Sequence, residues 1–204
     1  SSFSMRGDFM VVDKWSRAKF ALDYGIDIVL ELPYLSTVNS SDYFCFNAIK
    51  ILNEFGITDI AFGVELDNLE KLIHIKNILK SSSFDNILKT HLDKGHSYAN
   101  SSYHAIKELT DDEEIIKMYS LPNNTLAIGY LKALDTINPN IKITTIKRIA
   151  NNYYDEQIND TFINSATALR NEITLGNDIT KYTKINYDYY NPLIANQNIF
   201  TLLR

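Results

Sequence analysis

The sequence predicts an α/β fold built around a parallel sheet. Twice near its start, a helical pattern ends at a glycine and an apolar, β-branched run follows, first over 26–32 and then over 57–62. This alternation is typical of parallel sheets, because parallel neighbours are joined by a crossover that is usually helical. At 204 residues the chain is long enough for one domain of this class, with or without a small appendage.

The first helix is predicted to start after Asp13, whose carboxylate can accept hydrogen bonds from the amides of the next turn. Gly25 ends it, because glycine readily adopts the backbone conformation that closes many helices. The apolar run over 26–32 is too short for a helix, so we expect a strand that is buried on both faces. The helix should face the core with one stripe, formed by Trp15, Ala18 and Leu22.

The second repeat of this pattern is a helix over 42–55 and a strand over 57–62, which Gly63 is expected to end. An amphipathic helix over 69–79 follows. Residues 81–117 are highly charged and helical in pieces, and the last piece begins with acidic residues. We expect this segment to form a helical layer inserted over the sheet.

The third predicted strand lies in the second half of the chain. A strong helical pattern covers 125–137, and residues 141–148 then alternate apolar with polar or basic side chains, which predicts a strand with a basic end. A further helix is expected to begin at Asn164 or Ser165, where a polar side chain can cap it.

Composition limits the partners and the compartment. The net charge of −5 and the pI of about 5.3 give no global basic field, so we expect no DNA partner, and any RNA contact must use a local patch. The single cysteine, Cys45, lies in an apolar run and is expected to be a buried, inert thiol in a reducing cytoplasm. No apolar run approaches the roughly 20 residues of a membrane span, so no membrane partner is expected.

Candidate binding residues follow the predicted strands, because ligands of open parallel sheets bind beyond the carboxyl ends of the strands. Gly63 is either a plain strand-ending turn or a place where a flat ring approaches the backbone. Arg148 either pairs with surface carboxylates or holds a phosphate with its planar guanidinium. Asn123 and Asn124 either start a helix or read the edge of a purine with their amides.

Two further groups could contact anions. Ser165, Thr167 and Arg170 lie where a helix is expected to begin, which is either an ordinary N-terminus or a phosphate site built from amides, hydroxyls and a guanidinium. Lys14 adds a positive charge at the start of the first helix. The histidines are expected as surface or boundary residues of the helical segment, and none has metal-ligand spacing: His74, His91, His96 and His104.

Five segments, in matching order and spacing, resemble the bacterial tRNA(Met) cytidine acetate ligase family: 6–33, 61–65 (AFGVE), 122–134 (PNNTLAIGYLKAL), 144–148 (TTIKR) and 164–170 (NSATALR). The resemblance covers roughly residues 1–175 and implies a Rossmann-like nucleotidyltransferase domain of the His-x-Gly-His superfamily. Residues 176–204 are then expected to begin a C-terminal helical region. The opening strand and phosphate loop of the family would lie upstream of Ser1, so we expect an N-terminally truncated chain or one that has lost the reaction.

The resemblance also implies a reaction and its partners. ATP and acetate give acetyl-adenylate and pyrophosphate, and the acetyl group passes to the exocyclic amine of the wobble cytidine in elongator tRNA(Met). Magnesium is the expected companion of the nucleotide. Attack on the α-phosphate builds negative charge, so catalysis would depend on positioning and on cationic stabilisation.

The implied site residues are carried over from matching motifs. The ATP contacts would be Gly63, either Asn123 or Asn124, and Arg148. Phosphate contacts would come from Ser165, Thr167 and Arg170. The two cations that we expect to act in catalysis are Lys14 and Arg148.

Two other functions are compatible with the same sequence. One is nucleotidyl transfer to a small phosphorylated metabolite, which would not depend on acetate. The other is a nucleotide- or tRNA-binding fragment without turnover.

Overall fold

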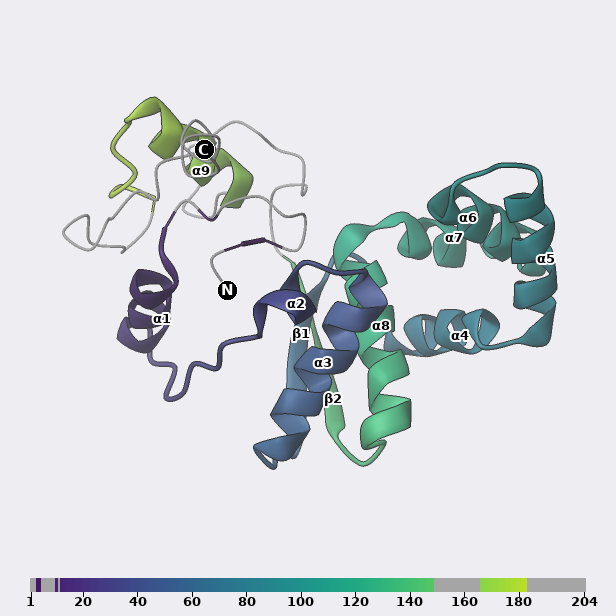
Figure 1. The fold of residues 1–204 in the computed structure, drawn as a ribbon, viewed down its shortest axis with the longest axis horizontal. Coiled ribbons are helices and arrows are strands. Elements are labelled where there is room, and N and C mark those ends of the chain that lie inside the picture. Colours follow the sequence, from purple (N-terminus) through teal and green to yellow (C-terminus); the bar gives the residue numbers. More distant parts are fainter. Residues whose placement is uncertain (1–2, 5–9, 11, 149–165, 183–204) are drawn as a thin grey trace. The chain divides into compact units, whose positions relative to one another are not determined.

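The computed structural model describes residues 3–4, 10, 12–148 and 166–182 of the chain (Figure 1). It divides into two compact units, which we describe separately. Unit 1 comprises Ser1–Ser40 and Ile149–Arg204, and unit 2 comprises Ser41–Arg148. The expected domain boundary at residue 175 stays a prediction.

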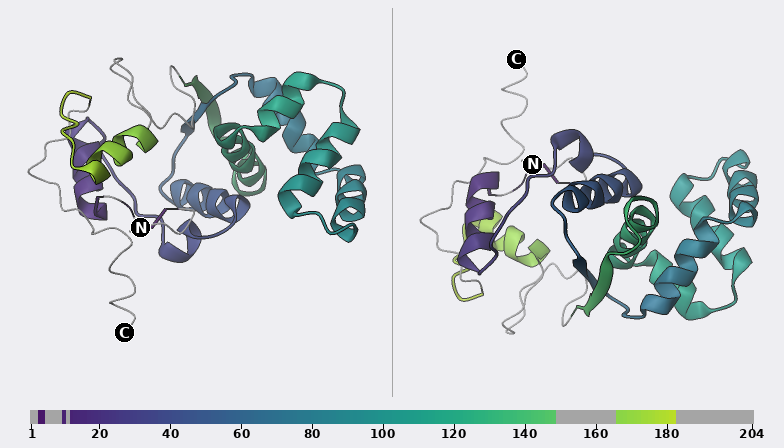
Figure 2. Two further views of the ribbon diagram at one scale, coloured as in Figure 1. Left: turned by 90° about the horizontal axis from the view of Figure 1, so that it is seen from above. Right: turned by 90° about the horizontal axis from the view of Figure 1, so that it is seen from below.

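Unit 2 has the predicted α/β architecture. Strands β1 (Asp59–Val64) and β2 (Lys142–Lys147) pair in parallel, which confirms the predicted crossover connection. Helices α3 (Ser41–Glu54) and α8 (Pro122–Ile137) lie side by side next to these strands (Figure 2). Their contact buries a small core with the strands, formed by Ile49, Ala133, Leu134 and Ile141.

The two faces of β1 differ in burial. Ile60, Phe62 and Val64 alternate onto the face that packs against the hydrophobic cores of unit 2. Ala61 and Gly63 lie on the opposite, exposed face. A side chain or ligand that meets Gly63 therefore does so on the exposed face of the strand.

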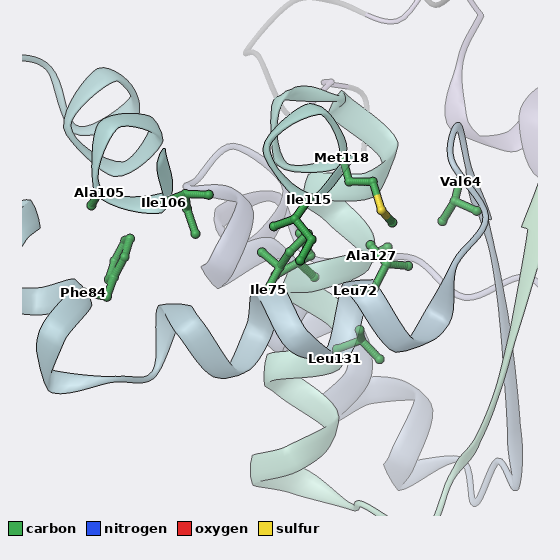
Figure 3. Close-up of a cluster of buried hydrophobic side chains, with 11 residues drawn as sticks. Val64, Leu72, Ile75, Phe84, Ala105, Ile106, Ile115, Met118, Ala127 and Leu131 are labelled. Carbon is green, nitrogen blue, oxygen red and sulfur yellow. The ribbon is translucent and has the colours of Figure 1, made fainter. Parts of the chain in front are cut away.

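Four helices lie between β1 and α8, and we call them the helical layer: α4 (Leu69–Leu79), α5 (Ser82–Asp93), α6 (Tyr98–Leu109) and α7 (Glu113–Ser120). The predicted helical insert over 81–117 is confirmed as α5, α6 and α7, but it packs on α4 and α8 and not over the strands. Their apolar faces form the main core of unit 2, in which α4 and α7 pack against α8 (Figure 3). Its fully buried side chains include Leu72, Ile75, Ile106 and Met118.

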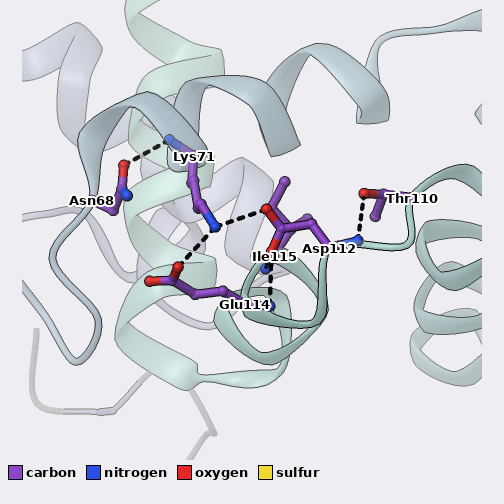
Figure 4. A network of polar contacts seen from close by, with 6 residues as sticks. All are labelled: Asn68, Lys71, Thr110, Asp112, Glu114 and Ile115. Carbon is purple, nitrogen blue, oxygen red and sulfur yellow. Dashed lines mark hydrogen bonds and ion pairs between the residues drawn. The ribbon is translucent and has the colours of Figure 1, made fainter.

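The acidic start of α7 acts as the sequence predicts. Asp112 caps the helix by accepting hydrogen bonds from the amides of Glu114 at 2.9 Å and Ile115 at 3.3 Å (Figure 4). Lys71 of α4 donates to the carboxylates of Asp112 and Glu114 at 2.7 Å, and its hydrogen bond holds the pKa of Asp112 below the usual range. The cap thus ties two helices of the layer together.

Helices α3 and α8 come closest at Gly129. Cys45 of α3 is fully buried beside it, and burial raises the pKa of its thiol to about 12. The expected burial of this thiol is therefore confirmed, and its raised pKa agrees with an inert thiol. A Cβ atom at position 129 would lie 2.8 Å from the Cys45 sulfur and 3.2 Å from its Cβ, so only glycine allows this helix spacing.

We expect Gly129→Ala to destabilise the protein by about 1–3 kcal/mol, because the added methyl group would overlap Cys45. Chemical denaturation followed by circular dichroism measures this change. Adding Cys45→Ala should recover part of the loss, since it removes the sulfur atom that the methyl group meets. Equal stability of Gly129→Ala and the parent protein would contradict this packing.

In unit 1, the first helix forms as predicted. Helix α1 spans Lys14–Asp23, Asp13 caps it by accepting from two backbone amides, and Gly25 follows it with a φ of 93°. The unit also contains the short helix α2 (Tyr34–Thr37) and α9 (Ala166–Leu175). The expected helix start at Asn164 or Ser165 lies outside the described residues.

Two predictions for unit 1 are wrong. Residues 26–32 form no strand, and Ile28 is 66% exposed. A strand needs a neighbour to pair its backbone groups, and the described residues of unit 1 contain no strand that could provide one. The expected core stripe of α1 is also wrong, because Trp15 is 74% exposed and no residue of the helix is buried.

Two boundaries in unit 2 also differ from prediction. Gly63 does not end its strand but lies within β1, because its backbone pairs opposite Ile146 of β2. Helix α8 begins at Pro122, so Asn123 and Asn124 form its first turn instead of preceding it. Proline suits this first position because it has no amide hydrogen to leave unpaired.

Among the described residues, no helix has the length and apolar character that a membrane crossing requires.

Candidate functional site

The structure brings Gly63 and Arg148 together at the carboxyl end of the two strands. Arg148 follows β2 directly, and its backbone amide donates to the carbonyl of Val64 at 2.9 Å. A Cβ atom on Gly63 would lie 3.7 Å from Cγ of Arg148. The side chain of Arg148 therefore passes beside Gly63, at the end of the sheet where ligands of this fold class bind.

The fold itself does not require a glycine at position 63. The backbone there has no positive φ, and a Cβ atom would make only ordinary contacts, at 3.7 Å or more. Ile146, its partner across the pair, is an apolar side chain that is 56% exposed. Glycine and an exposed isoleucine together offer a flat apolar surface, which favours the interpretation that a ring lies against this backbone.

Ile146 was not among the site residues predicted from the sequence. The signal was present in the alternation of β2, because residues 146 and 148 point to the same face of a strand. A residue two positions before a candidate phosphate-binding arginine therefore shares its face.

The guanidinium of Arg148 is available to a ligand. The residue is exposed and has no ion pair with any residue that the structure describes. Pairing with surface carboxylates, the alternative interpretation, is therefore not observed in this part of the chain. An exposed guanidinium beside a glycine is well suited to bind a phosphate through two parallel hydrogen bonds.

Asn124 is a structural residue. It is fully buried, and its Oδ1 accepts from the backbone amides of Glu65 at 2.9 Å and Leu66 at 3.2 Å. Its Nδ2 donates to the Leu66 carbonyl at 2.8 Å. The amide is thus used to hold the loop after β1, which leaves Asn123 as the better candidate for a ligand contact.

Glu65, in the loop after β1, also accepts hydrogen bonds from the first turn of α8. Its Oε1 accepts from the backbone amide of Asn123 at 3.1 Å and from Asn123 Nδ2 at 2.6 Å, while its Oε2 accepts from the amide of Asn124 at 3.0 Å. Leu121 offers no capping side chain, so Glu65 caps the helix from outside it. Because a carboxylate already fills this helix N-terminus, it is not the place for a phosphate.

The remaining predicted site residues belong to unit 1. Lys14 forms an ion pair with Glu31 at 2.8 Å, and its hydrogen bond lowers the pKa of that carboxyl. Arg170 donates to the hydroxyl of Thr167 at 3.2 Å, so these two residues lie together on α9 as predicted. Ser165 lies outside the described residues.

Three of the four histidines form a cluster that their sequence spacing did not reveal. The rings of His91 and His104 stack with centroids 5.2 Å apart, and His96 lies 6.0 Å from both. His91 also contacts Glu108 at 2.7 Å. Their position in the helical layer agrees with prediction, and within the described residues no group of three acidic, histidine or cysteine side chains is placed to hold a metal ion.

Comparison with known proteins decides the family. Residues 1–199 match the HIGH Nucleotidyl Transferase family. The chain belongs to this family. Its nucleotidyltransferase fold accounts for the parallel strands and for the grouping of Gly63 and Arg148 at their carboxyl ends.

Individual relatives of this chain agree with the resemblance that the sequence motifs indicate. The tRNA(Met) cytidine acetate ligase of Bacillus cereus is 38% identical over 173 residues, which is 84% of this chain and 44% of that protein. The enzyme of the same name from Bacillus cytotoxicus is 36% identical over 180 residues, which is 86% of this chain and 45% of that protein. The chain thus spans less than half the length of these relatives.

Two solved structures share its fold. Apo TmcAL of Thermotoga maritima superposes with a TM-score of 0.83 and 29% identity over 93% of this chain and 47% of the other. TmcAL of the same organism bound with alpha-thio ATP superposes with a TM-score of 0.74 and 31% identity over 85% of this chain and 41% of the other.

Proposed function

We propose that this protein activates acetate with ATP and transfers the acetyl group to the wobble cytidine of elongator tRNA(Met). The observation that carries the proposal is the exposed Arg148, which has no ion pair with a described residue and lies beside Gly63 at the carboxyl end of the parallel strands. This arrangement offers a flat surface for part of a nucleotide and a cation for its phosphates. The chain is similar to tRNA(Met) cytidine acetate ligases over most of its own length.

The proposed reaction has two steps. An acetate oxygen attacks the α-phosphorus of ATP, the bond to pyrophosphate breaks, and acetyl-adenylate forms. The exocyclic nitrogen of cytidine then attacks the acetyl carbonyl carbon and gives up a proton, and AMP leaves. Because the first step concentrates negative charge on the phosphates, its rate depends on fixed cations and on alignment of the reactants.

We assign separate roles to the site residues. Gly63 and Asn123 contact the nucleoside part of ATP, and Arg148 binds its phosphates. Lys14 of unit 1 supplies a second cation in catalysis. Phosphate contacts come from a Ser/Thr-rich motif, formed by Ser165, Thr167 and Arg170.

Magnesium and location complete the proposal. The described residues offer no cluster of three metal ligands, so Mg²⁺ would be held mainly by the phosphate oxygens, as is common for nucleotide-bound magnesium. When bound, it would neutralise charge on the triphosphate. A tRNA substrate and the buried Cys45 thiol agree with a cytoplasmic protein.

The test of this function is acetyl transfer by the natural gene product. With ATP, radiolabelled acetate and elongator tRNA(Met), we expect labelled N4-acetylcytidine, and no product when ATP, acetate or the tRNA is left out. Pyrophosphate release that does not depend on acetate would instead favour nucleotidyl transfer to a small metabolite. Nucleotide or tRNA binding without any turnover would favour a binding module.

We expect Gly63→Ala to weaken ATP binding at least about tenfold, because the methyl group would occupy the surface on which the ring lies. Stability should change by less than about 1 kcal/mol, since the chain has room for this methyl group. Calorimetry with ATP and thermal unfolding measure the two effects. Ala61→Ser adds one atom to the same face of β1 away from the site and should leave ATP affinity unchanged. Parent-like ATP affinity of Gly63→Ala would contradict the assignment.

A further inference from the structure

The side-chain amide of Asn123 is held in one orientation. Its Nδ2 lies 2.6 Å from Oε1 of Glu65, and a carboxylate oxygen can only accept hydrogen bonds. Turning the amide around would bring two acceptor oxygens to that distance, which is repulsive. Asn123 must therefore present its NH2 group to Glu65.

Glu65 is itself fixed, so it cannot move away to allow the turn. Its two carboxylate oxygens accept from the backbone amides of Asn123 and Asn124, and its own backbone amide donates to Asn124. The buried amide of Asn124 also holds the next residue, Leu66, through two hydrogen bonds. The orientation of Asn123 is thus set before any ligand binds, which is the requirement for a selective site.

The orientation leaves an acceptor for a ligand. Oδ1 of Asn123 has no hydrogen-bond partner within the described ranges, although the residue is partly buried. Adenine carries an amine donor at C6, and a side-chain amide of asparagine is a common partner of that edge. Guanine and hypoxanthine carry a carbonyl oxygen at the same place and would face this acceptor with another acceptor.

We propose that Glu65 determines the base specificity of the nucleotide site, by locking Asn123 so that its carbonyl oxygen selects adenine over bases with a carbonyl at C6. This inference rests on the proposed function, because it requires that a nucleotide binds at Gly63 and Asn123. Glu65 is a positioning residue, since it acts on the ligand through Asn123. Its role differs from that of a simple helix cap, which would affect all nucleotides equally.

The test compares ATP with inosine triphosphate, which differs at C6, on the natural gene product. We expect the parent protein to bind ATP about 10- to 100-fold more tightly than inosine triphosphate, as measured by calorimetry. In Glu65→Gln the new amide can donate or accept, so Asn123 can take both orientations. The ratio of the affinities for ATP and inosine triphosphate should therefore fall toward one. Asn123→Ala, which keeps Glu65 in place, should lose the preference as well.

A matched control and the ratio itself separate this role from a structural one. Asp67→Asn removes a carboxylate from the same loop, where Asp67 accepts from Thr145 at 2.5 Å, and should keep the parent preference. Weaker binding of both nucleotides by Glu65→Gln with an unchanged ratio would overturn the inference while ATP binding itself stands. If the parent protein binds neither nucleotide, the proposed function fails and the inference fails with it.

Discussion

Arg148→Ala is expected to lower acetylcytidine formation by at least about 100-fold, because it removes the cation that faces the phosphates as negative charge builds on them. The loss should appear in the acetyl-adenylate step, measured as acetate-dependent exchange of pyrophosphate into ATP. Stability should stay within about 0.5 kcal/mol of the parent, because Arg148 is exposed and has no ion pair with a described residue.

Lys142→Ala is the matched control for this variant. Lys142 is an exposed cation on the same face of β2 at the opposite end of the strand, so its loss changes the net charge equally but should leave the rate unchanged. Arg148→Lys should recover only part of the activity, because an ammonium group lacks the planar fork that binds two phosphate oxygens. Normal acetylation by Arg148→Ala would exclude this residue from the site.

Asn124→Ala is expected to destabilise the protein by about 3 kcal/mol or more. The change removes three hydrogen bonds and leaves the amides of Glu65 and Leu66 and the carbonyl of Leu66 without this partner in a buried place. Chemical denaturation followed by circular dichroism measures the difference. The slope of the transition should stay the same, because the surface exposed on unfolding hardly changes.

The neighbouring asparagine provides the comparison. Asn123→Ala removes a single side-chain hydrogen bond at a partly exposed position and should cost about 1 kcal/mol or less. The two variants thus separate a structural amide from one that is available to a ligand. Equal stability losses at positions 123 and 124 would contradict this division of roles.

Elements with strong local signals could be predicted from the sequence. Helix α4 has the predicted bounds, 69–79, because its apolar spacing is regular and Asn68 caps it. The cap of α1 by Asp13 was predicted for the same reason. Local signals could not decide whether residues 26–32 form a strand, because an apolar run forms a strand only where another strand pairs with it.

The candidate site was partly predictable. Gly63 and Arg148 could be selected because each follows a strand pattern, and parallel strands end at the same edge of a sheet. The contacts between Glu65 and Asn124 could not be predicted, because the two residues are 59 positions apart and no local pattern links them. Only the folded chain shows that Asn124 is buried and that its amide forms hydrogen bonds with the backbone.

These contacts also close a long loop. The chain leaves the sheet after Glu65, forms the four helices α4–α7, and returns at Asn123, where hydrogen bonds join the two ends. Once the ends of a loop are joined, changes in its length cost little, because the entropy of closure grows slowly with the number of residues. An exposed turn of the helical layer, such as the one around Gly95, can therefore gain or lose residues while the hydrogen bonds of Glu65 keep the two ends of the loop together. The joined ends thus separate the exposed turns of the helical layer, whose length can vary, from the residues around Glu65 and Asn123, whose geometry must be kept.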